Sequence, residues 1–585
     1  MKNNEIPRPE YPRPQMMREE WKNLNGKWQF EIDNGKSGRA RGLVDKSKLE
    51  KEIVVPFCPE SKLSGIENTD FMEAVWYKRK FEIPENWQDK RILIHFGAVD
   101  YETEVWINGE SAGTHRGGYT PFSFDITDYL QEGINEVTVC AEDDVRSGLQ
   151  PGGKQSPEYD SFRCYYTRTT GIWQTVWLEP VAESYIENFK VIPDPDNESV
   201  EMEISFSGNI KNYNFEAEAI LDNKTVGKKE ATVHNNTIYI ELDISEVELW
   251  EPENPVLYDL KLSLLDDNGK NIDEVESYFG LRTVSFTDNE ILLNGKPVFQ
   301  RLVLDQGFYP EGIYTAPSDE ALKKDVEIGQ KLGFNGARLH EKIFEPRFLY
   351  WADKKGYLVW GEHANWNLDI TTAQGLEQFL PEWLEAIKRD FNHPALIGWC
   401  PFNETWDNDN GTRQDDEVLR IVYETTKAID KTRPVIDTSG NYHVKTDIFD
   451  IHDYEQEPEI FAQKYSKEKN YNWPYVTHSE RQKYNGQPYF VSEYGGIWWN
   501  PEQKGEEGWG YGDYPTSEEE FLKRYQALTE TLLNNLEICA FCYTQLYDVE
   551  QEVNGLYTYY REPKFDPTII KEINNQKAAI EKNSN

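Results

Sequence analysis

Two short stretches decide how the second half of this chain folds: ALIGWCPFNE (395–404) and YFVSEYGG (489–496). Each contains a run of mostly apolar residues that leads to a glutamate, and segments with helical periodicity lie between the two. Short apolar strands that alternate with amphipathic helices indicate parallel β/α units. The two stretches therefore predict a parallel sheet in which two strands end in a carboxylate.

Eight such strands are predicted after about residue 285. Helical stretches separate most of them, beginning with 319–332, and only the fifth connection looks short. Eight β/α units over roughly 300 residues predict a (β/α)₈ TIM barrel, whose catalytic groups lie at the C-terminal ends of the strands. The predicted strands are 297–304, 335–340, 357–362, 395–403, 434–439, 448–453, 489–493 and 540–546.

The first half of the chain has a different pattern. Alternating runs such as WYKRKFEI (76–83) are separated by Gly, Asn and Pro turns, which predicts antiparallel β-sandwiches. We place a jelly-roll-like β-sandwich at 1–184, an immunoglobulin-like β-sandwich at 185–284 and the TIM barrel at 285–585. The PDPD stretch at 193–196 is interpreted as a linker.

The net charge of the chain disfavours two classes of partner. Its 62 Lys and Arg residues against 104 Asp and Glu residues give a formal net charge of −42, which repels phosphate backbones and anionic lipid head groups. We therefore expect neither nucleic acid nor a membrane as a partner. The six cysteines are too few and too dispersed for a disulfide framework, so reduced thiols and a cytoplasmic location are predicted.

One cysteine pair has metal-like spacing. Cys539 and Cys542 form a C-x-x-C motif, but they lie in the apolar run ICAFCYTQL (538–546), which indicates a buried strand rather than a zinc or redox loop. We predict no metal ligands and no cofactor; a bound Mg, Na or Ca ion is left open.

The two strand-end glutamates, Glu404 and Glu493, are the strongest functional indication. A carboxylate at the end of an apolar strand loses hydration and needs a compensating partner. For one such glutamate, a salt bridge or a helix cap is the favoured explanation. For the pair, glycoside hydrolysis is favoured, because one carboxyl group protonates the leaving oxygen while the other attacks the anomeric carbon.

These residues carry a resemblance to glycoside hydrolase family 2. Asn403-Glu404 after a strand and Glu493 within SEYGG resemble the two catalytic motifs of that family. WYKRKFEI, VWINGESAGTHRGGYTPFSFDIT (105–127) and TRTTGIWQTVWLEPV (167–181) are similar to its sugar-binding sandwich. The resemblance covers almost the whole chain and implies an exo-acting, retaining β-glycosidase. It implies Glu404 as general acid/base, Glu493 as nucleophile and Asn403 as a donor to the substrate 2-hydroxyl.

The resemblance also suggests neighbours for the catalytic pair. Arg338 occupies the place of an arginine close to the nucleophile, and Tyr454 that of a tyrosine that hydrogen-bonds it. Tryptophans after strand ends could line the sugar site, but a role in packing alone is equally expected. His340, His363 and His452 are more simply interpreted as structural histidines. Glu362 and Asp305 are candidates for sugar hydroxyls or a cation. The predicted substrate-binding residues are Asn403, Arg338, Tyr454, Asp305, His340, Glu341, Trp366 and Trp498.

Three departures from the family pattern concern the sugar. LVLDQGFYP (302–310) replaces a His-rich stretch, and His340-Glu341 replaces a Ser-His pair. The cation-bearing element that glucuronidases use reads EQEVNGLYT (550–558) here, and its glutamates would repel a uronate. We therefore expect a neutral substrate, with β-galactosidase as the default. The alternative specificities are β-mannosidase, arabinopyranosidase and galactofuranosidase, and β-glucuronidase is the least expected. An inactive carbohydrate-binding protein is the alternative outside enzymes. A homo-oligomer, either a dimer or a tetramer, is expected.

Overall fold

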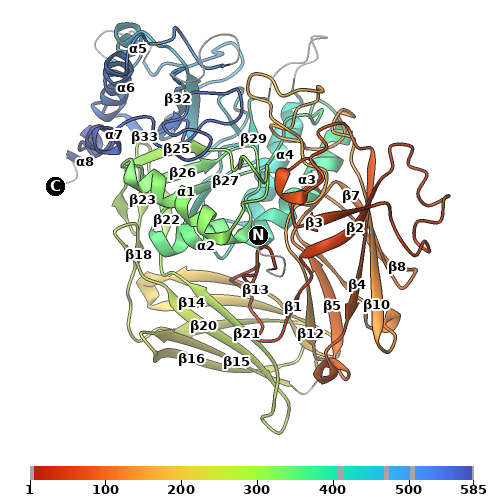
Figure 1. The fold of residues 1–585 in the computed structure, drawn as a ribbon. Coiled ribbons are helices and arrows are strands. Elements are labelled where there is room, and N and C mark those ends of the chain that lie inside the picture. The colour runs from red at the N-terminus through yellow and green to blue at the C-terminus, as the bar shows by residue number, and fades with distance from the viewer. Residues whose placement is uncertain (1–5, 212, 406–413, 467–472, 501–507, 583–585) are drawn as a thin grey trace.

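The computed structural model describes residues 6–211, 213–405, 414–466, 473–500 and 508–582. It has three parts, which the colours of Figure 1 distinguish. They are a red-to-orange β-sandwich, a yellow-to-olive β-sandwich and a green-to-blue α/β region. The α/β region lies against both sandwiches. No helix among the described residues is long and apolar enough to cross a membrane.

The first sandwich consists of two antiparallel sheets around one apolar core. Every second side chain along its strands lies in this core, for example Val137, Val139 and Ala141 of one strand, because alternate residues of a strand point to the same face. The four-stranded sheet has the order β1 (Lys22–Asn23), β12 (Val176–Val181), β5 (Arg91–Phe96) and β9 (Phe122–Asp125). The six-stranded sheet has the order β3 (Lys51–Val55), β2 (Gly26–Ile32), β4 (Ala74–Glu82), β10 (Ile134–Glu142), β7 (Glu102–Ile107) and β8 (Glu110–Arg116). A further pair is β6 (Val99–Asp100) and β11 (Gly171–Ile172).

The second sandwich has sheets of three and four strands, the size predicted for an immunoglobulin-like domain. The sheets are β13 (Tyr185–Asp194), β14 (Ser199–Ser207) and β17 (Thr237–Asp243), and β16 (Lys224–Val233), β15 (Tyr213–Leu221), β20 (Tyr258–Leu265) and β21 (Asn271–Phe279). The PDPD stretch is not a linker. It ends β13 and forms a short 3₁₀ turn at Pro195–Asn197, because β13 pairs with β14 across it.

Short strands then connect the second sandwich to the barrel: β18 (Trp250–Glu251) with β19 (Asn254–Pro255), and β22 (Val284–Phe286), β23 (Ile291–Leu293) and β24 (Lys296–Pro297). The last of these explains why the first barrel strand begins later than predicted. Pro297 pairs with Leu292 in β24, so the barrel strand starts at Gln300.

The barrel itself follows the predicted order of strands. Seven parallel strands form one continuous sheet: β28 (Leu396–Cys400), β27 (Leu358–Glu362), β26 (Gly336–Leu339), β25 (Gln300–Asp305), β33 (Ile538–Thr544), β32 (Tyr489–Gly495) and β31 (Phe449–Asp453). The fifth strand is short: β30 (Thr438–Ser439) pairs with β29 (Phe402–Asn403), which extends the fourth strand. Cys539 and Cys542 are buried on β33, as the apolar run predicted.

Helices cover the outside of the barrel (Figure 1). Their starts follow local rules, since Ser318, Thr372, Asp415 and Ser517 cap the first turns of four of them, and Pro346 occupies the first turn of another. No helix separates β30 from β31, which agrees with the short fifth connection. The helices are α1 (Asp319–Lys331), α2 (Pro346–Lys355), α3 (Ala373–Asp390), α4 (Asp416–Ile429), α5 (Pro458–Lys464), α6 (Glu518–Leu533), α7 (Pro567–Asn574) and α8 (Ala579–Lys582).

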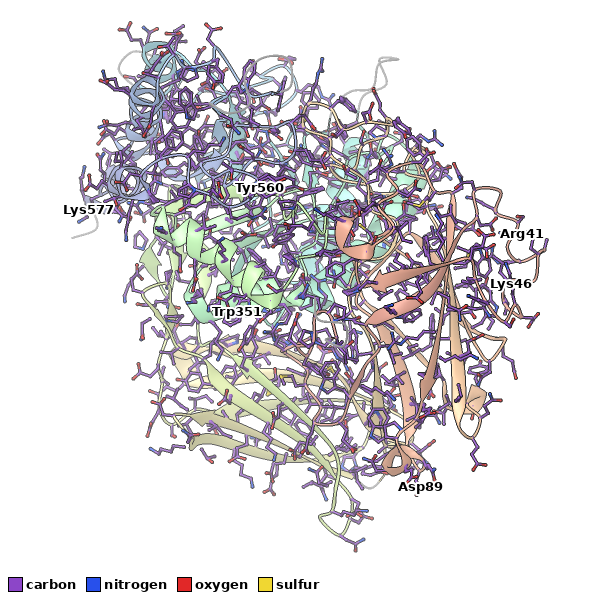
Figure 2. The ribbon with its side chains drawn as sticks, in the orientation of Figure 1. Arg41, Lys46, Asp89, Trp351, Tyr560 and Lys577 are labelled. Carbon is purple, nitrogen blue, oxygen red and sulfur yellow. The ribbon has the colours of Figure 1, made fainter. Side chains whose placement is uncertain are left out.

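The two sandwiches meet different parts of the barrel. A segment of the first, residues 143–170, reaches the loops that follow barrel strands; Gly152 N, for example, donates to Trp366 O at 2.9 Å. The second sandwich contacts the opposite end, where Arg282 donates to Leu396 O at the start of β28. By contrast, Arg41 and Lys46 lie at the outer edge of the first sandwich, away from the barrel (Figure 2), and both bind Glu31.

Candidate active site

Glu493 lies on β32, and both of its carboxylate oxygens have partners. Arg338 Nη1 donates to Oε1 at 3.1 Å, and the hydroxyl of Tyr454 donates to Oε2. The side chain is only 5% exposed, so these contacts take the place of water. The ring of Tyr454 is itself fixed by stacking on Tyr511, with 3.5 Å between ring centroids and 4° between planes.

Arg338 at the end of β26 connects several of the predicted site residues. Its Nε donates to Glu362 Oε1 at 2.6 Å, and its Nη2 donates to Asn403 Oδ1 at 3.2 Å. The guanidinium is buried, and a buried cation is stable only when it is paired in this way. Burial opposes its charge, but the carboxylates of Glu362 and Glu493 raise the pKa of Arg338 well above its usual value.

Glu404 follows β29 with a left-handed backbone conformation, at φ 46°. Such a conformation is unfavourable for a residue with a side chain and is concentrated at functional sites. Its backbone N–H donates to Ser439 O at 2.9 Å, which ties the end of the fourth strand to the fifth. The carboxylate is 17% exposed, so it faces space that a ligand could occupy.

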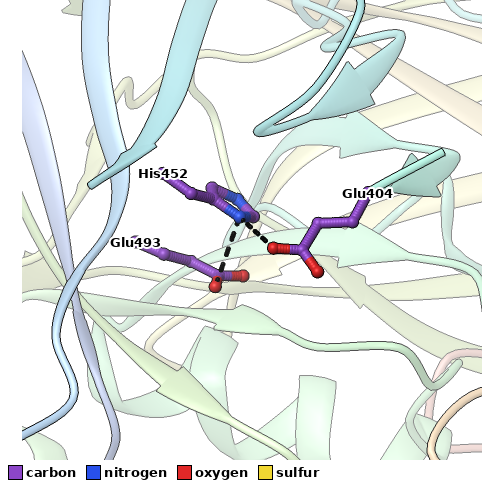
Figure 3. Close-up of side chains that lie close together, drawn as sticks. All are labelled: Glu404, His452 and Glu493. Carbon is purple, nitrogen blue, oxygen red and sulfur yellow. Dashed lines mark hydrogen bonds and ion pairs between the residues drawn. The ribbon is translucent and has the colours of Figure 1, made fainter. Parts of the chain in front are cut away.

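His452 lies between the two glutamates, as Figure 3 shows. Its Nδ1 is 2.8 Å from Glu404 Oε1 and 3.4 Å from Glu493 Oε2. One carboxylate oxygen of Glu404 and one of Glu493 lie within 4.8 Å of each other. On the other side of the ring, Nε2 is 3.0 Å from Ser439 Oγ. The ring is thus held at both nitrogens, with Nδ1 directed at the carboxylates.

Charge pairing decides the protonation of this group. Burial disfavours the imidazolium, but the carboxylates of Glu493 and Glu404 raise the pKa of His452 above its usual value. Burial would also raise the pKa of Glu404, but the hydrogen bond and charge of His452, with the charges of Lys154 and Arg338, lower it. These opposite shifts favour a proton on His452 over one on Glu404.

Asn403 occupies the rim beside Glu404. Asn365 holds its backbone from both sides, with Asn403 N donating to Asn365 Oδ1 at 2.7 Å and Asn365 Nδ2 donating back to Asn403 O at 3.0 Å. Trp366 Nε1 donates to the same carbonyl at 3.1 Å. The side-chain Nδ2 of Asn403 has no hydrogen-bond partner among the described residues, which leaves a buried donor next to the two glutamates.

His340 and Glu341 lie behind this group. His340 Nδ1 is 3.1 Å from Glu362 Oε2, and Glu341 N donates to the same oxygen at 3.2 Å. Glu362 therefore uses both oxygens on protein partners, which leaves it poorly placed for the sugar or cation role considered from the sequence. Glu341 Oε2 accepts from Trp366 N at 3.1 Å, and burial raises the pKa of Glu341 well above its usual value.

Two predicted residues lie outside the cluster. Asp305 is buried against Tyr547, whose hydroxyl donates to Oδ1 at 2.5 Å, and burial raises the pKa of Asp305 to about 6. Trp498 packs edge-on against Tyr514, with ring centroids 5.4 Å apart. The structure thus brings six of the eight predicted substrate-binding residues around the glutamates, and it gives these two other neighbours.

Comparison with known proteins agrees with this arrangement. Three family models match the chain in order: "Glycosyl hydrolases family 2, sugar binding domain" over residues 21–149, "Glycosyl hydrolases family 2" over 184–282 and "Glycosyl hydrolases family 2, TIM barrel domain" over 284–572. The chain belongs to glycosyl hydrolase family 2. The two sandwiches and the barrel described above are the domain architecture of that family.

Relatives within family 2 carry two different names. A putative β-glucuronidase of Formosa agariphila is 28% identical over 72% of this chain and 50% of its own length. A β-galactosidase of Thermoanaerobacter pseudethanolicus is 28% identical over 66% of this chain and 51% of its own length. The chain thus spans about half the length of these two relatives. The prediction that β-glucuronidase is the least expected specificity is wrong, because that name is well represented among the relatives.

Solved structures agree at the level of the fold. A β-glucuronidase of an uncultured Clostridium sp. has a TM-score of 0.79 and 23% identity, covering 95% of this chain and 98% of that chain. A β-glucuronidase of Ruminococcus gnavus has a TM-score of 0.80 and 19% identity, covering 96% and 98%. Both share the architecture of this family 2 chain from end to end.

Two residues near the glutamates received no functional role from the sequence. His452 was interpreted as a structural histidine, although it lies two residues before Tyr454 at the end of a barrel strand, and that position was the available signal. Lys154 belongs to the first sandwich, and nothing in its local sequence places it near the barrel. Its ammonium lies 3.4 Å from the ring centroid of Trp366.

The same cluster is the place where a metal ion could bind. Among the described residues, Glu404, His452 and Glu493 are the group whose ligand atoms converge closely enough. However, Arg338 and Tyr454 already occupy the oxygens of Glu493, and the raised pKa of His452 favours a proton on the nitrogen that a metal would need. The donor set therefore fits a hydrogen-bonded carboxylate pair better than a metal centre.

Proposed function

We propose that this chain is a retaining exo-β-glycosidase that removes a terminal, neutral β-linked sugar, with β-galactosides as the default substrates. The observation that carries the proposal is the approach of a Glu404 oxygen to within 4.8 Å of a Glu493 oxygen. Retaining enzymes place their two carboxyl groups about 5 to 5.5 Å apart, whereas inverting enzymes leave a wider gap for a water molecule. The short separation therefore supports a covalent intermediate.

The environments of the two glutamates support different roles. Glu493 accepts hydrogen bonds from Arg338 and Tyr454, which hold its carboxylate in a fixed orientation, as a nucleophile requires. It would attack the anomeric carbon and form a glycosyl ester as the bond to the leaving oxygen breaks. Glu404 would protonate that oxygen, and then accept a proton from the water that hydrolyses the ester.

His452 is the proposed source of the proton in the first step. It shares one proton with Glu404 across 2.8 Å, and its raised pKa keeps that proton available at neutral pH. As the leaving oxygen gains negative charge, the proton can pass through Glu404 to it. Asn403 Nδ2, the unpartnered donor beside the pair, is the proposed contact for the sugar 2-hydroxyl.

The proposal is tested with nitrophenyl α- and β-glycosides of galacto, gluco, manno, glucurono, arabino and fuco configuration. The wild type should hydrolyse one β-glycoside best, and Glu493→Gln should lose about 10⁴-fold or more of that activity, since it removes the nucleophile. Glu404→Ala should regain turnover with azide, which attacks the glycosyl ester without a general base. Wild type with azide is the control.

The same experiment separates the alternatives. Full activity in Glu493→Gln would refute the nucleophile assignment, and an absence of azide rescue would count against Glu404 as acid/base. A rise in melting temperature with a sugar, together with no turnover of any glycoside, would indicate the carbohydrate-binding protein instead.

A further inference from the structure

A segment of the first sandwich runs directly along the catalytic rim of the barrel. Gly153 N donates to Ala364 O at 3.2 Å, and Asn367 Nδ2 donates to Gln155 O at 2.8 Å. Gly153 has φ 55°, and a β-carbon there would lie 2.3 Å from Glu341 O. The backbone can approach Glu341 this closely only because residue 153 lacks a side chain. These backbone contacts therefore fix the position of the next residue, Lys154, at the pocket.

Lys154 is a buried cation whose hydrogen-bonding capacity is unused. Its side chain reaches over the indole of Trp366, and the residue is 5% exposed. Within the described part of the chain, no hydrogen bond or ion pair holds its ammonium. Trp366 in turn donates to the carbonyl of Asn403, so the ammonium lies over a ring that is anchored to the catalytic strand.

The energetics of this position require an oxygen partner. A cation over an indole gains about 2 kcal/mol when it is desolvated, but the ring accepts none of its three N–H donors in the way that an oxygen does. Burial opposes the charge of Lys154, but Cys164, Glu404 and Glu341 together raise its pKa above its usual value. An ammonium that lies over Trp366 without a protein hydrogen bond among the described residues is suited to a ligand that brings oxygen atoms.

We propose that Lys154 is a substrate-binding residue of the catalytic pocket, which donates hydrogen bonds to hydroxyl oxygens of a neutral sugar held beside Asn403 and Glu404. This inference rests on the proposed glycosidase function and extends it, because it makes the first sandwich part of the sugar site. The first sandwich would then help to determine which sugar binds and with what affinity.

Charge favours a neutral sugar over a uronate at this point. Lys154 has the carboxylates of Glu404, Glu341 and Glu552 around it, and all three act on its charge. Arg338, the other buried cation of the pocket, is already paired with Glu362 and Glu493. A uronate would add its carboxylate close to those of the catalytic glutamates, whereas hydroxyl groups need only the donors of Lys154.

The test compares Lys154→Met with Lys80→Met, a solvent-exposed lysine of the same sandwich. For the best neutral β-glycoside, Lys154→Met should raise KM about tenfold or more, the equivalent of one charged hydrogen bond. Its melting temperature should not fall, since methionine fills the same space without a buried charge. Lys154→Arg should recover part of the affinity. Lys80→Met should match the wild type.

Other outcomes overturn distinct claims. An unchanged KM in Lys154→Met, with an active wild type, refutes the role of Lys154 and leaves the glycosidase proposal intact. Loss of uronide turnover alone, with neutral glycosides unaffected, refutes the neutral-sugar assignment. Failure of the wild type on every glycoside, with no sugar binding to Glu493→Gln, refutes the proposed function, and the inference falls with it.

Cys164 offers a second readout that does not depend on turnover. It is the partly exposed cysteine of the chain, whereas the other five are buried, and the charge of Lys154 acts on its thiol. A sugar bound at Lys154 should therefore slow the alkylation of Cys164 by iodoacetamide at alkaline pH, measured by mass spectrometry on Glu493→Gln. Protection should disappear in the double variant with Lys154→Met. Alkylation that is indifferent to saturating sugar would overturn the placement of the sugar at Lys154.

Discussion

The two sandwiches of this protein have similar strand patterns, yet they contact opposite ends of the barrel through different chemistry. The first reaches the C-terminal rim, where Thr167 N donates to the carboxylate of Glu550 at 3.1 Å and the hydroxyl of Tyr166 donates to Glu552. The second contacts backbone at the other end, where Trp250 Nε1 donates to Asp353 O at 2.9 Å. The first contact is made to side chains in the segment after β33, and the second is made to the backbone of α2.

This difference follows the general division of a TIM barrel. The C-terminal face carries chemistry, and the opposite face carries stability. Changes at the second sandwich should therefore alter folding and spare the sugar site, whereas changes at residues 143–170 should alter sugar binding. Each of the following variants tests whether effects on folding and effects on sugar binding are separated in this way.

The largest effect is expected at the scaffold contact. Trp250 on β18 is fully buried, in an apolar cluster that it shares with residues of the barrel. Trp250→Ala should lower the free energy of unfolding by about 3 to 5 kcal/mol, because it removes a large buried side chain and leaves Asp353 O without its donor. Denaturant unfolding measures this loss, and KM of the folded variant should stay at the wild-type value.

The matched control for this variant is Tyr239→Ala on the same sandwich, where the side chain is 76% exposed and stability should hardly change. A raised KM in Trp250→Ala would show that the second sandwich communicates with the sugar site.

An intermediate effect, dependent on pH, is expected where the first sandwich anchors residues 143–170. Glu60 Oε2 accepts from Thr170 N at 3.2 Å, and burial raises the pKa of Glu60 to about 8. Because the folded state binds this proton more tightly than the unfolded state, stability should fall as pH rises from about 4.5 to 8. Glu60→Gln cannot lose a proton there, so its melting temperature should exceed that of the wild type increasingly across this window.

The difference at pH 8 should be on the order of 2 to 4 kcal/mol and should nearly vanish at pH 5. Glu132→Gln, an exposed glutamate of the same sandwich, is the control. Parallel melting curves of Glu60→Gln and wild type at every pH would contradict the raised pKa.

The smallest effect is expected at the contact between the first sandwich and the rim. Tyr166→Phe removes the hydroxyl that binds Glu552 and that accepts from Gln306 Nε2 at 2.6 Å. These hydrogen bonds contribute about 1 kcal/mol to holding the segment that carries Lys154. Without them the segment should be less well ordered, and KM should rise about fivefold with little change in melting temperature. Tyr159→Phe, a 58% exposed tyrosine of the same segment, should have no effect. An unchanged KM would separate Tyr166 from the sugar site.

The sequence predicted the catalytic rim better than it predicted the pocket around it. Glu404, Glu493, Arg338 and Tyr454 could be expected near one another because each lies in or just after the end of a predicted barrel strand, and strand ends meet at one face. The role of Asp305 was expected by the same rule, but its side chain turns to Tyr547 inside the barrel. Strand position places a residue at the rim and leaves the direction of its side chain open.

The sequence by itself determined the order of the three domains, the alternation of strands and helices, and the two rim glutamates, because local periodicity and turn residues decide these features. Tertiary structure alone decided that His452 lies between the glutamates and that Lys154, nearly 250 residues before Glu404, reaches over Trp366 beside it. Contacts between residues so distant in sequence depend on how whole domains pack, and no local pattern of residues encodes that packing.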